Sequence, residues 1–153
     1  MAFVLALLIG VIAGLRAFLP LATVSWAAYL GWLTLADSLL AFLGYRWTPW
    51  VLTALALVEL GTDQLPSTPS RTVPMQFGTR IVTATVSGAA IGAPFGLLIV
   101  GFIAGIIGAV VGTLGGRAVR AKLANSLRSD TPAALIEDAV AIVAAILIIM
   151  LLR

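Results

Sequence analysis

The chain consists of long apolar runs separated by charged residues and prolines. Residues 1–15 carry no charge, Arg16 follows, and residues 17–36 are uncharged again. Residues 81–116 form the longest uncharged run, with Pro94 inside it. Because a membrane-spanning helix needs about 20 apolar residues, this pattern predicts an all-α, polytopic bundle of transmembrane helices. Six helices are expected, over residues 2–18, 20–42, 48–64, 79–93, 95–116 and 132–152.

Prolines mark several of the expected helix ends. Thr48-Pro49 and Thr131-Pro132 each place a Thr at the N-cap and a Pro at the first helical position, which is typical of a helix start. Prolines with several Ser and Thr residues in 64–78 indicate a loop. The helices over 2–18 and 79–93 would be short for a bilayer and are expected to be tilted, half-spanning or re-entrant. An arrangement with five spans is the alternative.

Composition excludes several classes of protein. The 153 residues are 61 % hydrophobic and 10 % charged, against about 45–50 % and about 25 % in soluble domains. A soluble globular chain and a disordered chain are thereby excluded, and residues 1–153 are expected to form a single transmembrane domain. The chain has no Cys and no His, which removes disulfides, thiolate chemistry and the commonest general base and metal ligand. We expect no cofactor, no metal and no catalytic residue.

The placement of Lys and Arg predicts the location and orientation. No Lys or Arg precedes the first apolar run, so residues 1–19 are expected to be a retained helix. Because the sequence has no Cys, no glycosylation sequon and no lipidation motif, a bacterial inner membrane is the expected location. With six spans, the loops 65–78 and 117–131 share one side and carry most of the basic residues. The positive-inside rule therefore predicts that these two loops are cytoplasmic and both termini are outside. The basic cluster at 117–128 has no aromatic residue, so we expect anionic-lipid contact and no nucleic acid.

The chain also contains a faint internal repeat. Gly14 precedes Pro20 as Gly88 precedes Pro94, and the same offset takes Asp63 onto Glu137. Repeat halves over residues 1–65 and 79–153, joined by the loop 66–78, would each hold three helices. Because three is an odd number of spans, the second half would be inverted, as in many transporter scaffolds; chance similarity between apolar segments is the alternative.

Glycines recur at helical spacing in the second half of the chain. Such spacing places them on one face of a helix, where another backbone can approach closely. We expect this face to pack within the chain or between subunits of a homo-oligomer, and the alternative is that it lines a narrow pathway. The residues are Gly88, Gly92, Gly101, Gly105, Gly108 and Gly112.

Charged residues inside the expected membrane segments form the candidate site. Charges at lipid depth are costly, so they usually pair, face the bundle interior and mark function. They would be structural ion pairs, with Arg16 and Arg80 each bridging carboxylates, or the lining of a polar cavity for a charged solute, an ion or a lipid headgroup. The two interpretations are compatible, since a pathway also needs its charges paired when it is empty. Because the carboxylates outnumber the arginines, a surplus carboxylate would hold a proton and suit cation or proton coupling. The residues are Arg16, Glu59, Asp63, Arg80, Glu137 and Asp138.

Aromatic residues gather between positions 26 and 50. Tryptophan and tyrosine are enriched at the headgroup level of membranes, so this group is expected to be an interfacial anchor on the outer face. An aromatic substrate gate is the alternative. The residues are Trp26, Tyr29, Trp32, Tyr45, Trp47 and Trp50.

Four blocks of the sequence carry a family resemblance. They are Gly14–Pro20, Glu59–Pro66, Arg80 with Ser87–Ala90, and Glu137–Ala141. Together they resemble an uncharacterised family of small bacterial membrane proteins, the domain of unknown function 4126, over most of the chain. The resemblance implies that the charged residues of the candidate site and Pro66 belong to family motifs, and it implies no activity. The family more often has Lys at the position of Gln64.

Three functions fit these features. The first is a small transporter or channel-like protein that works as a homo-oligomer in the lipid bilayer on a small charged solute or ion. The second is an intramembrane enzyme on a lipid phosphate or diphosphate, in which Glu59 and Asp63 would hold Mg²⁺ and Ser70, Arg71 and Thr72 would bind phosphate; this set is loosely similar to that of polyprenyl-diphosphate phosphatases. The third is a non-catalytic assembly subunit.

Overall fold

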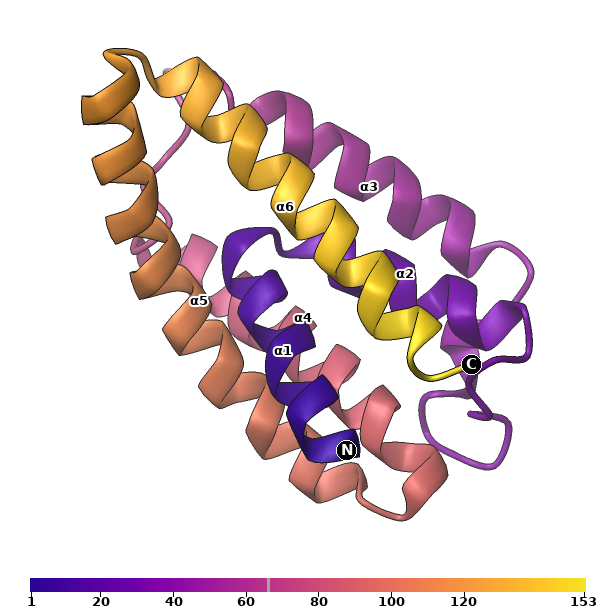
Figure 1. Ribbon diagram of the computed structural model, residues 1–153. Helices are drawn as coiled ribbons and strands as arrows, with labels where there is room; N and C mark the ends of the chain where they lie inside the picture. The colour runs from indigo at the N-terminus through magenta and orange to yellow at the C-terminus, as the bar shows by residue number, and fades with distance from the viewer. Residues whose placement is uncertain (66) are drawn as a thin grey trace.

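The computed structural model describes residues 1–65 and 67–153, which form six α-helices, two short 3₁₀ helices and no β-strand (Figure 1). Pro66 of the family motif lies outside the described residues. The all-α class predicted from the sequence is confirmed. The helices are α1 (Ala2–Leu15), α2 (Phe18–Tyr29), η1 (Ala41–Gly44), α3 (Thr48–Thr62), α4 (Pro74–Gly92), η2 (Ala93–Phe95), α5 (Leu98–Leu127) and α6 (Asp130–Met150).

Successive α-helices alternate in direction. The ends of α1, α3 and α5 lie beside the starts of α2, α4 and α6, and we call this part of the molecule the charged end. Both chain termini lie at the other end (Figure 1). The aromatic residues also gather away from the charged end, where Trp26 packs edge-on against Trp50 with 5.0 Å between ring centroids and Arg153 lies over the ring of Trp32.

Glycines bring α1, α4 and α5 into backbone contact. A Cβ added at Gly105 would overlap the carbonyl oxygen of Ala84 in α4, and one added at Gly112 would overlap that of Val11 in α1. Without side chains at these points the helices can approach until their backbones touch. We call this region the glycine contact. It includes Gly88, Gly92, Gly101, Gly105, Gly108 and Gly112, together with Gly10 and Gly14 of α1.

Helix α2 is much shorter than the predicted helix over 20–42. It ends at Tyr29, and Gly31 follows with a φ of +76°. The amide of Gly31 donates to the carbonyl of Ala28, and the amide of Trp32 donates to that of Ala27. This is the Schellman pattern, in which a glycine in the left-handed region ends the helix. The apolar character of residues 30–42 favours a helix, but Gly31 in the left-handed region ends α2 before them.

Two helices are longer than predicted. Helix α4 begins at Pro74 rather than at residue 79, since proline at the first helical position lacks only an amide that would have no helical partner. Helix α5 continues to Leu127, although residues 117–131 were predicted to be a loop. The segment is rich in Arg, Ala, Lys and Leu, which are strong helix formers, and the helix ends where Arg128 adopts a φ of +53°. Pro94 separates α4 from α5, as expected.

Many large apolar side chains point away from the core. Leu57 on α3, Ile99 on α5 and Val140 on α6 are all more than half exposed. Within the described residues two helices, α5 and α6, are long and apolar enough to cross a membrane, while α1, α2 and α3 are apolar but shorter. Exposed apolar surface on this scale marks a face that meets protein or lipid rather than water.

Candidate functional site

Arg16 and Ala17 join α1 to α2 at the charged end, and we call this connection the α1–α2 turn. Polar groups from three other helices bond to the backbone groups that lack helical partners there. Arg16 is extended, with φ −140° and ψ 114°. The carbonyl of Gly14, near the end of α1, accepts from Arg80 Nη1 at 2.9 Å and from Thr113 Oγ1 at 3.2 Å. These bonds matter because the last carbonyls of a helix have no helical partner.

Glu59 of α3 stabilises the other side of the α1–α2 turn, at the start of α2. Its two carboxylate oxygens accept from the backbone amides of Ala17 at 2.7 Å and Phe18 at 2.9 Å, where α2 begins. A carboxylate there satisfies unpaired amides and opposes the positive end of the helix dipole. Glu59 therefore caps α2 from a distant part of the chain.

Arg16 is fully buried and joins two helices. Its Nε donates to Asp138 Oδ1 of α6 at 2.6 Å, and its Nη1 contacts Asp63 Oδ2 at the end of α3. A buried guanidinium needs such partners, because removing one side of a buried ion pair leaves an uncompensated charge. Arg16 thus holds α3 and α6 against the end of α1.

Arg80 lies beside this group and is less completely satisfied. Its Nη2 is 3.6 Å from Asp63 Oδ2 and 3.9 Å from Glu59 Oε1. Arg80 is 1 % exposed, yet its Nε has no hydrogen-bond partner among the residues that the structure describes. A buried donor without a partner is uncommon and calls for an explanation.

Further arginines surround Glu137 and Asp130. Arg71 grips Glu137 in a fork, with Nη2 2.6 Å from Oε2. Arg120 forms a second fork on Asp130, at 3.0 and 2.6 Å, and its Nη1 lies 3.6 Å from Glu137. Arg117 contacts only the hydroxyl of Thr72, at 3.5 Å, and pairs with no carboxylate among the described residues.

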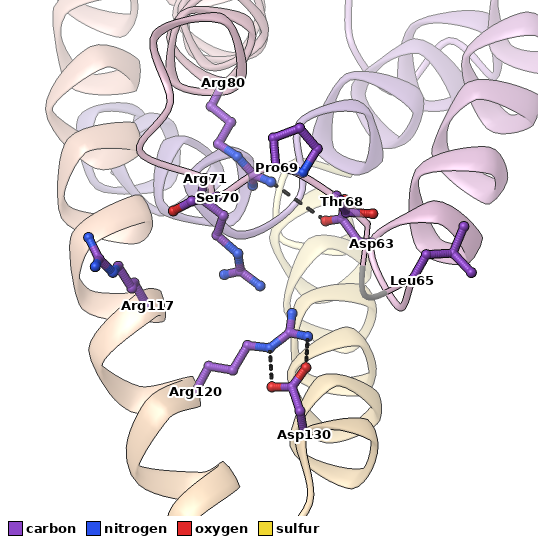
Figure 2. A pocket seen from close by; sticks show the side chains of 10 residues that line it. All are labelled: Asp63, Leu65, Thr68, Pro69, Ser70, Arg71, Arg80, Arg117, Arg120 and Asp130. Carbon is purple, nitrogen blue, oxygen red and sulfur yellow. Dashed lines mark hydrogen bonds and ion pairs between the residues drawn. The ribbon is translucent and has the colours of Figure 1, made fainter.

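These side chains enclose a cavity of about 290 Å³, which we call the arginine-lined cavity. Figure 2 shows guanidinium groups from α4, α5 and the segment before α4 turned toward a shared space. The lining has more positive than negative side chains. It consists of Asp63, Leu65, Thr68, Pro69, Ser70, Arg71, Arg80, Arg117, Arg120 and Asp130.

The structure brings the charged residues of the candidate site together at the charged end, with two differences from expectation. Glu137 pairs with Arg71 and Arg120 rather than with Arg16 or Arg80. These added arginines also mean that the buried carboxylates do not outnumber their cations. The sequence pattern does not reveal these two partners, because the charges in 117–131 favour a loop at Arg120 and the polar segment around Arg71 fits phosphate binding.

The geometry gives the magnesium hypothesis no support. Glu59 is occupied by two backbone amides and Asp63 by Arg16 and Arg80. No group of three or more His, Cys, Asp or Glu side chains within the described residues is placed to hold a metal ion. Of the predicted phosphate contacts, Ser70 and Arg71 line the cavity, whereas Thr72 bonds to Arg117 outside its lining.

Comparison with known proteins places the chain in a family. No curated protein and no solved structure matches it. The family model described as Domain of unknown function (DUF4126) matches residues 3–151, which is nearly the whole chain. The chain therefore belongs to the domain of unknown function 4126 family, as the motifs at its charged end indicated.

Proposed function

We propose that this protein is a polytopic membrane protein that binds an anionic group in the arginine-lined cavity and moves it across the bilayer. The observation that carries the proposal is the cavity itself, in which arginines outnumber carboxylates where α3 ends, α6 begins and both lie near α4 and α5. Guanidinium groups bind carboxylate and phosphate oxygens through paired N–H donors.

Lipid surrounds the helices in this proposal. The exposed apolar side chains on α3, α5 and α6 would then face hydrocarbon rather than water. Residues 98–116 of α5 are uncharged and extend roughly 28 Å at 1.5 Å per residue, which matches a hydrocarbon core of about 30 Å. The shorter helices α1, α2 and α3 would be tilted or partly spanning, and the bundle would have up to six spans.

The positive-inside rule then sets the orientation. Arg71, Arg117, Arg120 and Lys122 lie at or near the charged end, so this end would face the cytoplasm of a bacterial inner membrane. The aromatic residues around Trp26 and Trp50 would lie at the outer headgroup level. The connection before α4 and the end of α5 would replace the two cytoplasmic loops predicted over 65–78 and 117–131.

The α1–α2 turn supports movement of the bound group across the bilayer rather than static binding. Helix ends that face a polar site inside the bundle bind substrates and ions in many transporters, because the last backbone groups of a helix have no helical partner. At the α1–α2 turn, Arg80 donates to the carbonyl of Gly14, and the same side chain lines the arginine-lined cavity. An incoming anion would compete with Asp63 and Glu59 for Arg80.

Two further expectations belong to the same proposal. Each half, residues 1–65 and 79–153, supplies three helices of alternating direction, as an inverted repeat requires. A homo-oligomer remains expected, but it would use a surface other than the glycine contact, which is filled by helices of the same chain.

Flux measurements in proteoliposomes test the proposal. Purified protein is reconstituted, and uptake of radiolabelled phosphate, sulfate and rubidium is compared for the unaltered chain, Arg80→Gln and Arg46→Gln. Arg46 is the matched control because it lies far from the cavity, over the ring of Trp47. We expect anion uptake to fall at least about tenfold in Arg80→Gln and to persist in Arg46→Gln. Anion flux that is equal in both variants, or flux of rubidium alone, would overturn the proposal.

A further inference from the structure

An apolar hollow adjoins the arginine-lined cavity. It is a groove of about 300 Å³ between α1, α5 and α6, which we call the apolar groove. Its walls include Val111, Gly115, Val119 and Val140. Arg120 lines both the groove and the arginine-lined cavity, so a single guanidinium borders the two hollows.

The groove opens on the outer surface of the molecule. Val111, Val119 and Val140 along its walls are each more than half exposed. Its charged members are Arg120 and Glu137, which lie where the groove meets the cavity. A ligand that fits both hollows would therefore have an anionic head and an apolar chain.

We propose that the anion of the arginine-lined cavity is the phosphate headgroup of an anionic lipid, with one of its hydrocarbon chains lying in the apolar groove. This inference rests on the proposed function and names the class of its substrate. The phosphate would bind Arg120 and Arg80, and the chain would leave along Gly115 and Val140 toward the hydrocarbon of the bilayer.

Two features of the contacts support a phosphate at this place. Arg120 Nη1 lies 3.6 Å from Glu137, beyond hydrogen-bond distance, so a phosphate oxygen can replace that contact. Arg80 Nε is buried without a partner among the described residues, and a phosphate oxygen would supply the missing acceptor. Arg120 Nη1 and Arg80 Nε would then each donate to the phosphate, while the fork of Arg120 on Asp130 stays in place.

The depth of the site fits a lipid headgroup. Arg117 and Arg120 lie just after the uncharged residues 98–116 of α5, which extend about the thickness of the hydrocarbon core. Lipid phosphates lie at this boundary, and basic pockets between helices on the cytoplasmic side bind anionic headgroups. A lipid could enter the groove sideways from the bilayer.

A substitution that fills the apolar groove distinguishes a lipid ligand from a free anion, because only the lipid has a chain that needs the groove. Gly115 lines the groove, and a Cβ added there meets no atom within 4 Å. Gly115→Leu therefore fills the groove without forcing the backbones apart. Gly61→Leu is the matched control, because Gly61 has equal open space on α3 and lies outside the groove. Val140→Trp fills the same groove from α6 and serves if Gly115→Leu does not elute as a monodisperse species.

Equilibrium binding is measured with radiolabelled dioleoyl phosphatidic acid in neutral detergent micelles and, separately, with radiolabelled inorganic phosphate. We expect phosphatidic acid to bind about tenfold more weakly to Gly115→Leu or Val140→Trp and as before to Gly61→Leu. We expect Arg120→Gln to weaken both ligands. The inference would be overturned if phosphatidic acid bound the groove-filling variants as tightly as the unaltered chain, or if inorganic phosphate bound as tightly as the lipid. Either result would still be compatible with an anion site in the arginine-lined cavity. Absence of binding by both ligands would overturn the proposed function as well.

Discussion

The glycine contact and the charged end meet at Gly14, and they hold helices together by opposite means. At the glycine contact no side chain separates the backbones of α1, α4 and α5. At the charged end, long side chains bridge the gaps between helix ends, as when Arg16 reaches Asp63 and Asp138. Gly14 takes part in both, since its Cα lies against α5 and its carbonyl accepts from Arg80.

The difference determines which change each region tolerates. The glycine contact depends on the absence of atoms, so an added methyl group disrupts it. The charged end depends on complete pairing, so a removed charge disrupts it, because its buried partners lose their counter-charge. Substitutions that add volume or remove charge should therefore affect the two regions differently.

The largest expected effect is the loss of Arg16. Arg16→Leu leaves Asp63 and Asp138 without their main cation in a buried place, and removing one partner of a buried pair costs about 3–5 kcal/mol. Thermal unfolding of the purified protein in detergent measures the change. Arg46→Leu, at an exposed position away from the charged end, should change stability by less than about 0.5 kcal/mol. Equal effects of the two substitutions would show that the network around Arg16 does not stabilise the fold.

The next largest effect is a difference between two glycines of α5, one in backbone contact with α1 and one in open space. Gly112→Ala places a Cβ against the carbonyl of Val11 and should cost about 1–3 kcal/mol, as overpacking does. Gly115→Ala meets no atom within 4 Å and should be neutral or stabilising by up to about 1 kcal/mol, because alanine favours the helix. The same unfolding assay compares them. A Gly112→Ala variant as stable as Gly115→Ala would contradict backbone contact between α1 and α5.

A smaller effect tests the cap on α2. Glu59→Ala removes both acceptors of the Ala17 and Phe18 amides and should cost about 0.5–2 kcal/mol, the range measured for lost helix caps. Amide hydrogen exchange at the start of α2 is the more specific measurement, because the freed amides should exchange faster there than in α5. Unchanged protection at Ala17 and Phe18 would argue against the cap.

The smallest effect on stability is expected at the outer part of the charged end. Arg120 pairs with Asp130, whose side chain is 65 % exposed, and such pairs contribute about 0–1 kcal/mol. Arg120→Gln should thus leave the melting temperature nearly unchanged, and raising the salt concentration should abolish the remaining difference. A large loss of stability would instead assign Arg120 to the structural network with Arg16.

The helix boundaries show how far local signals reach. The starts of α3 and α6 lie within two residues of their predicted positions because each follows from a Thr-Pro pair. The end of α2, just before Gly31, and the start of α4 at Pro74 carry equally local signals, a glycine after the helix and a proline at its first position. The continuation of α5 through Arg117 and Arg120 required weighing helix propensity against charge, and charge alone pointed to a loop.

The sequence by itself determined the helical class, the apolar exterior and most of the buried charges, although not Arg71 and Arg120, because these depend on composition and on patterns within single segments. Only the tertiary structure decided that Glu59 caps α2, that Glu137 pairs with Arg71, and that arginines from separate segments enclose one cavity. Such pairings join residues as far apart as Arg16 and Asp138, 122 positions along the chain. Their choice depends on how whole helices pack, and several carboxylates of similar chemistry were available to every arginine.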